Sequence, residues 1–368
     1  MNWPELAELR DIRVGPLTVG NSKTRLSLAA DPPHPALGHM RSGAPDSVVK
    51  ILPLSDHDEN SMPVIEEPII YGGLLFRHFG HAISESIHRL WPRFAMKELA
   101  SARIAFHLVN NTKVMPYVTE AFNLHGIPRR HILGIDQPML FRHLFVGPQA
   151  RQMAGPTIIP NYRSMLDHSL GRRLPPPGGT RRLYVSRMYH HHTGSFYGES
   201  FVEKQLAACG FEIIYPEQHR LTALVEILRD SELAVFAEGS AIHALELCGS
   251  VTPAAFVIGR RGMSTERFTP LLSNICQKWK ISDHLLANLG MSADKKKHSG
   301  LIRLSAVMRD LQEFSGIAAI GSFTPDQLSD AIRMDLEHHI GDERNERDAD
   351  YARRASEMAD IALTREPF

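Results

Sequence analysis

Apolar and polar positions along the first half of the chain switch repeatedly between the spacing of strands and the spacing of helices. Short apolar runs at 104–109 and 140–146 have the length of buried strands. Between them, the segment 116–124 has the pattern of a helix, which Gly126 and Pro128 would end. Strands and helices that alternate at this spacing predict βαβ units and a mainly parallel sheet.

The alternation resumes after the proline- and glycine-rich stretch 174–179, which we interpret as a linker. Each apolar run in this second half is followed by a segment with helical spacing. The predicted strands lie at 182–187, 211–215, 233–237 and 254–259, and the predicted helices at 199–209 and 221–231. This order is half of a doubly wound fold, so the second half predicts a Rossmann-like domain.

Both ends of the chain depart from this pattern. Residues 1 to about 70 have prolines between short apolar runs, which favours an irregular, β-rich entry into the first domain. From Thr324 onward the pattern is helical, with Thr324 as the cap and Pro325 in the first turn. We therefore predict an N-terminal α/β domain at 1–173, a Rossmann-like domain at 180–322 and C-terminal helices at 323–368.

Composition narrows the class of protein. Lysine and arginine together number 41, as do aspartate and glutamate, so the 368-residue chain has no formal net charge. A general nucleic-acid binder normally has a basic excess. The three cysteines form no CxxC pair, which argues against a zinc ribbon or disulfide framework and fits a reducing compartment. No signal segment and no apolar run near the ~18 residues of a membrane span is visible. We expect a cytoplasmic protein, with peripheral membrane attachment and a homodimer left open.

The stretch 233–247, LAVFAEGSAIHALEL, combines a predicted strand, a tight turn at Glu238, Gly239 and Ser240, and a predicted helix at 241–247. The first N–H groups of a helix have no partner within the helix, and the helix dipole adds partial positive charge there. This turn is therefore a candidate binding site for an anion such as a diphosphate. A Gly-Ser turn at the end of a strand also occurs for packing reasons, and the pattern alone does not decide between the two.

Two further groups of residues are expected at the carboxyl ends of strands, where ligands of such folds bind. Ser186 and Arg187 end the strand 182–187, and the planar guanidinium of arginine suits phosphate oxygens. The alternative is a surface arginine in a salt bridge. His243 follows the glycine turn, and its alternative is a histidine with an ordinary hydrogen bond on a helix face.

In the first half, His81 and Glu85 are spaced i, i+4 on a predicted helix, and His88 and Arg89 share their face. A histidine beside a carboxylate is an arrangement for acid–base chemistry. It is equally compatible with a structural hydrogen bond. The cluster His190-His191-His192 is interpreted as a polar loop, because three consecutive side chains cannot face one metal ion.

Four segments together resemble glycosyltransferase family 61, in its bacterial branch. Residues 79–91, FGHAISESIHRLW, resemble the GHFxxExxxRLW signature, and 183–187, LYVSR, resemble a strand of the family. Residues 210–217, GFEIIYPE, resemble another strand, and 238–243, EGSAIH, stand in the place of an HGSALTN-like turn. The resemblance covers roughly residues 70 to 260.

This resemblance implies two Rossmann-like domains facing across a cleft, as in GT-B enzymes, with the acceptor on the N-terminal side. It implies inverting transfer of a sugar from a nucleotide-sugar donor, usually UDP-linked, to a glycan or other hydroxyl acceptor, for example in surface polysaccharide synthesis. The absence of a DxD-type pair from the region of the expected cleft fits a mechanism without a divalent metal or other cofactor.

We expect each role in this reaction to be carried by specific residues. His81 is the first choice as general base, with Glu85 or Glu238 second. The donor-binding residues are expected to be Ser186, Arg187, Gly239, Ser240, Ala241 and His243. Arg187 and the turn N–H groups would hold the diphosphate and stabilise the charge on the leaving nucleotide.

The chain departs from the family pattern at Glu238, at His243 and in the loop after Arg187, where Glu199 is the one plausible counterpart. These departures support an alternative hypothesis, a catalytically silent nucleotide- or sugar-binding partner in a polysaccharide assembly complex. An α/β-hydrolase is disfavoured, because the turn reads EGSAI and Ser240 lacks the GxSxG elbow.

Overall fold

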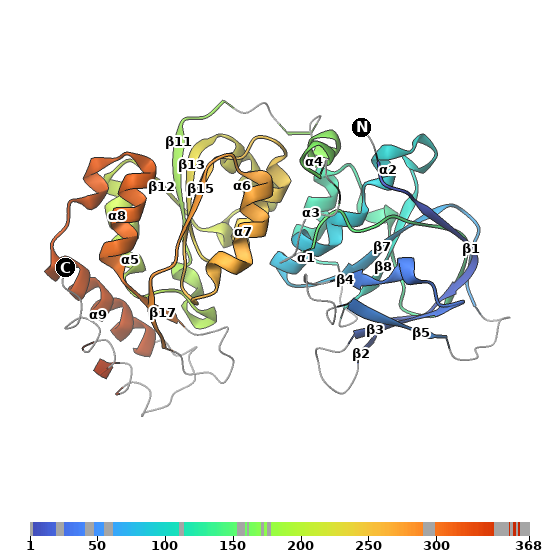
Figure 1. Ribbon diagram of the computed structural model, residues 1–368, viewed down its shortest axis with the longest axis horizontal. Coiled ribbons are helices and arrows are strands. Elements are labelled where there is room, and N and C mark those ends of the chain that lie inside the picture. Colours follow the sequence, from blue (N-terminus) through green and yellow to red (C-terminus); the bar gives the residue numbers. More distant parts are fainter. Residues whose placement is uncertain are drawn as a thin grey trace. The chain divides into compact units, whose positions relative to one another are not determined.

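The structure is a computed structural model. It describes residues 3–19, 26–40, 48–54, 62–109, 114–152, 159, 162–170, 173–174, 178–289, 299–341, 353, 356, 357 and 360. The chain forms two compact units. Unit 1 comprises Met1–Pro176 and His243–Ser250, and unit 2 comprises Pro177–Ile242 and Val251–Phe368. Both units are mixed α/β (Figure 1).

Unit 1 is built on one mixed sheet with the strand order β4-β5-β3-β1-β10-β7-β8-β9. The strands are β1 (Ala7–Val14), β3 (Leu26–Asp31), β4 (His39–Met40), β5 (Val48–Pro53), β7 (Ile69–Leu75), β8 (Arg103–Leu108), β9 (Ile132–Gly134) and β10 (Met139–Val146), with β2 (Thr18–Val19) on β3 and β6 (Val64–Ile65) on β10. β10, β7, β8 and β9 are parallel, as predicted. β1 pairs antiparallel with both β10 and β3, so the expectation of a mainly parallel sheet holds for only part of unit 1.

The parallel part of this sheet positions helix α1 (Phe79–Ser86). Every residue of β7 is buried, as expected of a strand with both faces covered. The α1 helix packs on β7 and on α3 (Pro116–Leu124), and a 3-10 turn, Ile87–Arg89, continues it (Figure 1). Two short helices, α2 (Pro92–Ala95) and α4 (Tyr162–Leu170), complete the described helices of unit 1.

Unit 2 has a parallel sheet with the order β12-β11-β13-β14-β15. Its strands are β11 (Arg181–Val185), β12 (Glu212–Ile214), β13 (Ser231–Ala237), β14 (Ala254–Ile258) and β15 (Trp279–Ser282). Helices α5 (Glu199–Ala208) and α8 (Leu304–Ser315) lie on one face, and α6 (Leu221–Arg229) and α7 (Ser264–Ile275) on the other (Figure 1). This is a doubly wound sheet, and the strands predicted from the sequence are confirmed.

The predicted helix 241–247 is instead a 3-10 segment, Ser240–Cys248. All residues from Ile242 to Cys248 are buried. The segment therefore has no exposed polar face of the kind that alternates with the apolar face of a surface helix. The sequence predicted an α-helix whose dipole would begin at this turn, and the observed 3-10 segment does not form that helix. The segment is also divided between the units, because His243–Ser250 is counted with unit 1.

The described part of the C-terminal region contains helix α9 (Pro325–Gly341), which packs on α5. An antiparallel pair, β16 (Leu285–Leu289) and β17 (Ser299–Ile302), precedes α8. The charged segment predicted to be helical after 341 lies largely outside the described residues. The functional division at 173, 180 and 322 stays a prediction. No helix among the described residues is long and apolar enough to cross a membrane.

A buried charge cluster fixes the segment 243–250 within unit 1. The carboxylate of Glu246 accepts a hydrogen bond from Arg151 Nη1 at 3.1 Å. His88 Nε2 lies 3.4 Å from Glu246 Oε2, and His243 Nδ1 lies 3.3 Å from Oε1. Burial by itself would raise the pKa of Glu246, but the charge of Arg151 and the bond from His243 outweigh it and lower that pKa to about 2. Glu246 is therefore ionised and is the anion that compensates Arg151.

Replacing Glu246 with alanine should destabilise the protein strongly. The change leaves the Arg151 guanidinium buried without its carboxylate, which costs about 3–5 kcal/mol in such pairs. Urea denaturation measures the free energy of unfolding. The matched control is Glu232→Gln, which breaks an exposed pair with Arg182 and should cost about 1 kcal/mol or less. Similar small losses in both variants would contradict the assignment.

Stability should also fall as the pH is lowered from 7 to 5. Burial lowers the pKa of His88 to about 4 and that of His125 to about 3. The unfolded chain binds these protons near pH 6.5, so between that pH and about 4 it binds more protons than the folded state. Stability is fully present above pH 6.5 and is lost as the pH falls towards 4. Thermal denaturation at pH 7.5, 6 and 5 should show it, with a parallel loss in the control His338→Gln, whose side chain is exposed. Equal melting temperatures at the three pH values would refute this expectation.

Candidate functional site

The strand order of unit 2 reverses between β11 and β13, because β12 lies on one side of β11 and the later strands lie on the other. In open α/β sheets ligands bind at the carboxyl ends of the strands at such a switch point. Arg187 follows β11 here, and Gly239 follows β13. Arg260 and Arg261 follow the next strand, β14. The topology therefore brings three arginines and the glycine turn to one edge of the sheet.

The guanidinium of Arg187 lies against the turn at Gly239. Its Nε and Nη2 donate to the carbonyl oxygen of Gly194 at 3.2 and 3.1 Å. A Cβ built at Gly239 would collide with Nη1 of Arg187, so only glycine lets the side chain take this place without a shift. Burial lowers the pKa of Arg187, while Glu199 opposes that change. The arrangement holds a cation directly beside the predicted anion-binding turn.

A buried carboxylate, Glu199, organises the loop that carries Arg187. Its Oε1 accepts from the backbone N–H of Arg187 at 2.6 Å, from Tyr184 Oη at 3.0 Å and from Ser186 Oγ at 3.2 Å. Its Oε2 accepts from Ser195 Oγ. Burial nevertheless raises the pKa of Glu199. The structure thus directs the hydroxyl of Ser186, predicted to bind the donor, towards Glu199.

Helix α9 also supports the loop that follows Arg187. Its Asp335 carboxylate accepts from the backbone N–H groups of Gly198 and Ser200 at 2.9 and 3.1 Å. An acidic group at the first turn of α5 is also favoured by the helix dipole. Sequence reasoning missed this residue, because nothing in the pattern of α9 indicates which helix it contacts.

Glu238 is buried and surrounded by donors. It accepts from the backbone N–H of Arg260 at 2.8 Å, from Ser264 Oγ at 2.7 Å and from Arg261 Nε at 2.6 Å. Burial alone would raise the pKa of Glu238, but Arg261 and Arg260 together lower it. The carboxylate is therefore ionised and engaged, which favours an anchoring role over that of a base. Its catalytic role stays a prediction.

Four arginines gather at this edge of the sheet. Arg267 Nη1 lies 4.0 Å from Glu238 and joins Arg187, Arg260 and Arg261, while the carboxylates of Glu199, Glu238 and Glu217 lie near enough to act on the charge of Arg187. Burial, together with the nearby charges of Arg187 and Arg261, lowers the pKa of Arg260 to about 9. Crowded guanidinium groups suit an anion with several oxygens. The signal that sequence reasoning missed was the arginine pair directly after a predicted strand.

The remaining predicted donor-binding residues do not all belong to the same unit. Ser240 and Ala241 begin the 3-10 segment beside Gly239 and are partly exposed. His243 is counted with unit 1, where its Nδ1 contacts Glu246. The structure therefore brings Arg187, Gly239, Ser240 and Ala241 together within unit 2, and it places His243 in the buried Glu246 cluster.

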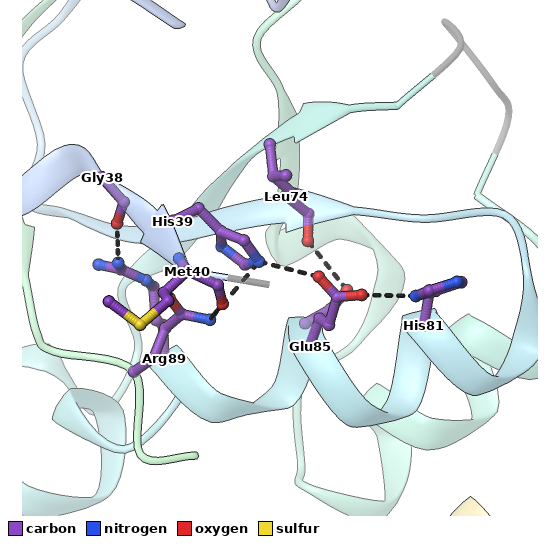
Figure 2. Close-up of polar contacts among 9 residues, drawn as sticks. Gly38, His39, Met40, Leu74, His81, Glu85 and Arg89 are labelled. Atoms are coloured by element: carbon purple, nitrogen blue, oxygen red, sulfur yellow. Dashed lines mark hydrogen bonds and ion pairs between the residues drawn. The ribbon is translucent and has the colours of Figure 1, made fainter. Parts of the chain in front are cut away.

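In unit 1 a buried carboxylate joins two histidines (Figure 2). Glu85 is fully buried, and its Oε1 lies 2.5 Å from His81 Nδ1. Its Oε2 lies 3.2 Å from Nε2 of His39, which comes from β4. His81 is the exposed end of this row, with 29% of its side chain accessible. The predicted His81–Glu85 pair is formed, and His39 extends it into the core.

His39 could not be found from the sequence, because it lies 46 residues before Glu85 in a stretch without regular pattern. Its place depends on Gly73, which has a positive φ of 80° and no Cβ. A Cβ there would lie 2.9 Å from His39 Nδ1. The close approach and the backbone conformation both require glycine at this position.

Glu85 determines the orientation of the His81 ring. The contact at Nδ1 leaves Nε2 as the nitrogen directed away from the carboxylate (Figure 2). A carboxylate at one ring nitrogen fixes the tautomer and the orientation of the ring. Arg89, on the same face, has a structural role: its Nη1 donates to Gly147 O at 2.8 Å and to Ala36 O at 3.2 Å. The arrangement suits proton transfer at His81.

The described residues contain no group of three or more His, Cys, Asp or Glu side chains arranged to hold a metal ion. Whether the protein works without a metal stays a prediction. The two sites have different chemistry: unit 1 carries an exposed histidine with a buried carboxylate, and unit 2 carries clustered arginines beside a glycine turn.

The arginine cluster should bind inorganic pyrophosphate. A ligand present at 100 times its Kd stabilises the native state by about 2.7 kcal/mol, which raises the melting temperature by a few degrees. The variants Arg187→Gln and Gly239→Ala should lose this shift, the first by removing the charge and the second by displacing it. Arg182→Gln, on the same strand but in an exposed pair with Glu232, should keep it. A shift that persists in both site variants would place the anion elsewhere.

Comparison with known proteins gives one family. Residues 79–252 match the family model described as Glycosyltransferase 61. No curated protein matches the chain. The matched segment contains His81, Glu85, Arg187 and Gly239, and it ends before Arg260 and Arg261. The family expected from the four sequence motifs is confirmed.

Proposed function

Because the chain belongs to the glycosyltransferase 61 family through residues 79–252, we propose that this glycosyltransferase takes its sugar from a nucleotide-sugar donor, with a UDP-sugar as the first candidate. The observation that carries the proposal is the guanidinium of Arg187 held against Gly239 at the switch point. A diphosphate is the part of such a donor that clustered arginines recognise.

In the proposed reaction an acceptor hydroxyl oxygen attacks the anomeric carbon of the donor sugar. The bond from that carbon to the diphosphate oxygen breaks, and the configuration is inverted. Negative charge then grows on the leaving nucleoside diphosphate, where Arg187 and the neighbouring arginines stabilise it more in the transition state than in the ground state. These cations would perform the task of a divalent metal, so we propose that none is required.

The acceptor hydroxyl must lose a proton as it attacks. We propose His81 as the base, with Nε2 taking the proton and Glu85 stabilising the charged ring that results. Glu85 is the second candidate, but its complete burial argues against direct contact with an acceptor. Glu238 is disfavoured, because its oxygens are engaged by arginine and serine donors.

In this proposal each unit supplies one half of the chemistry of a GT-B-like enzyme. Unit 1 activates a glycan or another hydroxyl acceptor, and unit 2 holds the donor. A cytoplasmic site of action and a role in surface polysaccharide synthesis belong to the same proposal. They follow from the nucleotide-sugar donor and the resemblance of the motifs.

Substitutions in the two sites should separate catalysis from donor binding. His81→Ala should lower kcat about 10²- to 10⁴-fold and leave donor affinity unchanged, because it removes only the proton acceptor. Arg187→Ala should abolish both donor binding and transfer. The control His338→Ala changes an exposed histidine on α9 and should keep most of the activity.

Donor consumption and calorimetric affinity for UDP-sugars measure these effects. Full activity of Arg187→Ala would exclude the proposed donor site. Tight binding of a nucleotide sugar by the wild-type protein, without turnover for any acceptor tested, would instead favour a silent binding partner.

A further inference from the structure

Two exposed apolar side chains stand beside the arginine cluster of unit 2. Tyr189 is 53% exposed and follows Arg187 by two residues. Met263 is 59% exposed and follows Arg261 by two residues. Three large apolar residues among those described are more than half exposed, and two of them, Tyr189 and Met263, follow the ends of β11 and β14. Apolar side chains kept in water next to clustered cations indicate contact with a ligand.

A second aromatic residue holds the ring of Tyr189 in place. Its ring packs edge to face on Tyr215, with the centroids 4.7 Å apart and the planes at 88°. Tyr215 follows β12, and its hydroxyl donates to Glu203 Oε2 at 3.2 Å. The Tyr189 ring is therefore held in place while about half of its surface stays open, as a stacking platform requires.

The order of the strands in the sheet determines the order in which these side chains lie along its edge. Tyr189 and Tyr215 belong to the β12–β11 side of the switch point, and Gly239 lies at its centre, at the end of β13. Met263 lies on the far side, beyond β14. β11 and β14 are two strand spacings apart, which is about 10 Å. The edge thus presents an aromatic ring, then cations, then an aliphatic side chain.

A nucleotide sugar has the same succession of parts: an aromatic base, a diphosphate and a sugar ring. We propose that Tyr189 is the stacking platform for the nucleobase and that the transferred sugar lies on the β14 side, beside Met263. The inference rests on the proposed diphosphate site at Arg187. It adds the direction in which the donor lies and the residue that recognises its base.

The chemistry of the two side chains favours this direction. Every nucleobase has a planar π face, and a tyrosine ring stacks on it whatever the base. Methionine has no planar face, and its flexible thioether suits the C–H surface of a sugar ring. The reverse orientation would place the base against methionine and leave the braced aromatic platform to the sugar.

Calorimetry with the full-length chain tests the assignment, using UDP, GDP and ADP with inorganic pyrophosphate as the probe without a base. Tyr189→Ala should weaken the binding of the preferred nucleoside diphosphate roughly tenfold or more, because it removes the stack. Its affinity for pyrophosphate should stay within about twofold of wild type, because the arginines are untouched. Tyr189→Phe keeps the ring and should bind like wild type. Met334→Ala, which changes an equally exposed residue on α9, is the matched control and should have no effect.

Each other outcome overturns a defined part of the argument. Unchanged nucleotide binding in Tyr189→Ala, or an equal loss for nucleotide and pyrophosphate, would overturn the platform alone. A loss of nucleoside diphosphate affinity in Met263→Ala but not in Tyr189→Ala would reverse the direction of the donor. Failure of the wild-type protein to bind any of these probes would overturn the proposed donor site itself, and the platform with it.

Discussion

The placement of one charged side chain, Arg187, underlies the whole edge of unit 2. Its guanidinium reaches the switch point because Gly239 has no side chain there and because Gly194 accepts from two of its nitrogens. The loop between them is held by two buried carboxylates, Glu199 and Asp335, that accept backbone N–H groups. The position of this partly buried cation therefore depends on carboxylates in the interior and on a helix near the C-terminus.

In both units a buried carboxylate positions an ionisable side chain, but the side chains that are positioned have different chemistry. In unit 1 the buried Glu85 orients the partly exposed His81, and His39 contacts the same carboxylate from inside. In unit 2 the buried Glu238 gathers Arg260 and Arg261. In each case a carboxylate that solvent does not reach orients a partly exposed ionisable group, His81 in unit 1 and Arg261 in unit 2. Desolvation strengthens these contacts, so the reactive groups are positioned before any ligand arrives.

Features that local pattern determines were predictable from the sequence. The strands of unit 2, the pairing of His81 with Glu85, and the position of Arg187 and Gly239 at one edge follow from spacing and strand ends. His39 and Asp335 were not predictable, because their partners lie 46 and more than 130 residues away. The 3-10 form of Ser240–Cys248 also depends on tertiary packing, which the periodicity of a buried segment does not reveal.

The assignment of His243–Ser250 to unit 1 affects the order in which the chain can fold during synthesis. Unit 1 is otherwise complete at residue 176, but the carboxylate that compensates its buried Arg151 belongs to Glu246. A growing chain must therefore extend 70 residues past that point, through the first three strands of the second sheet, before this charge is neutralised. Domains usually fold in turn as they leave the ribosome. Here unit 1 lacks the segment His243–Ser250 until the first part of unit 2 has been synthesised.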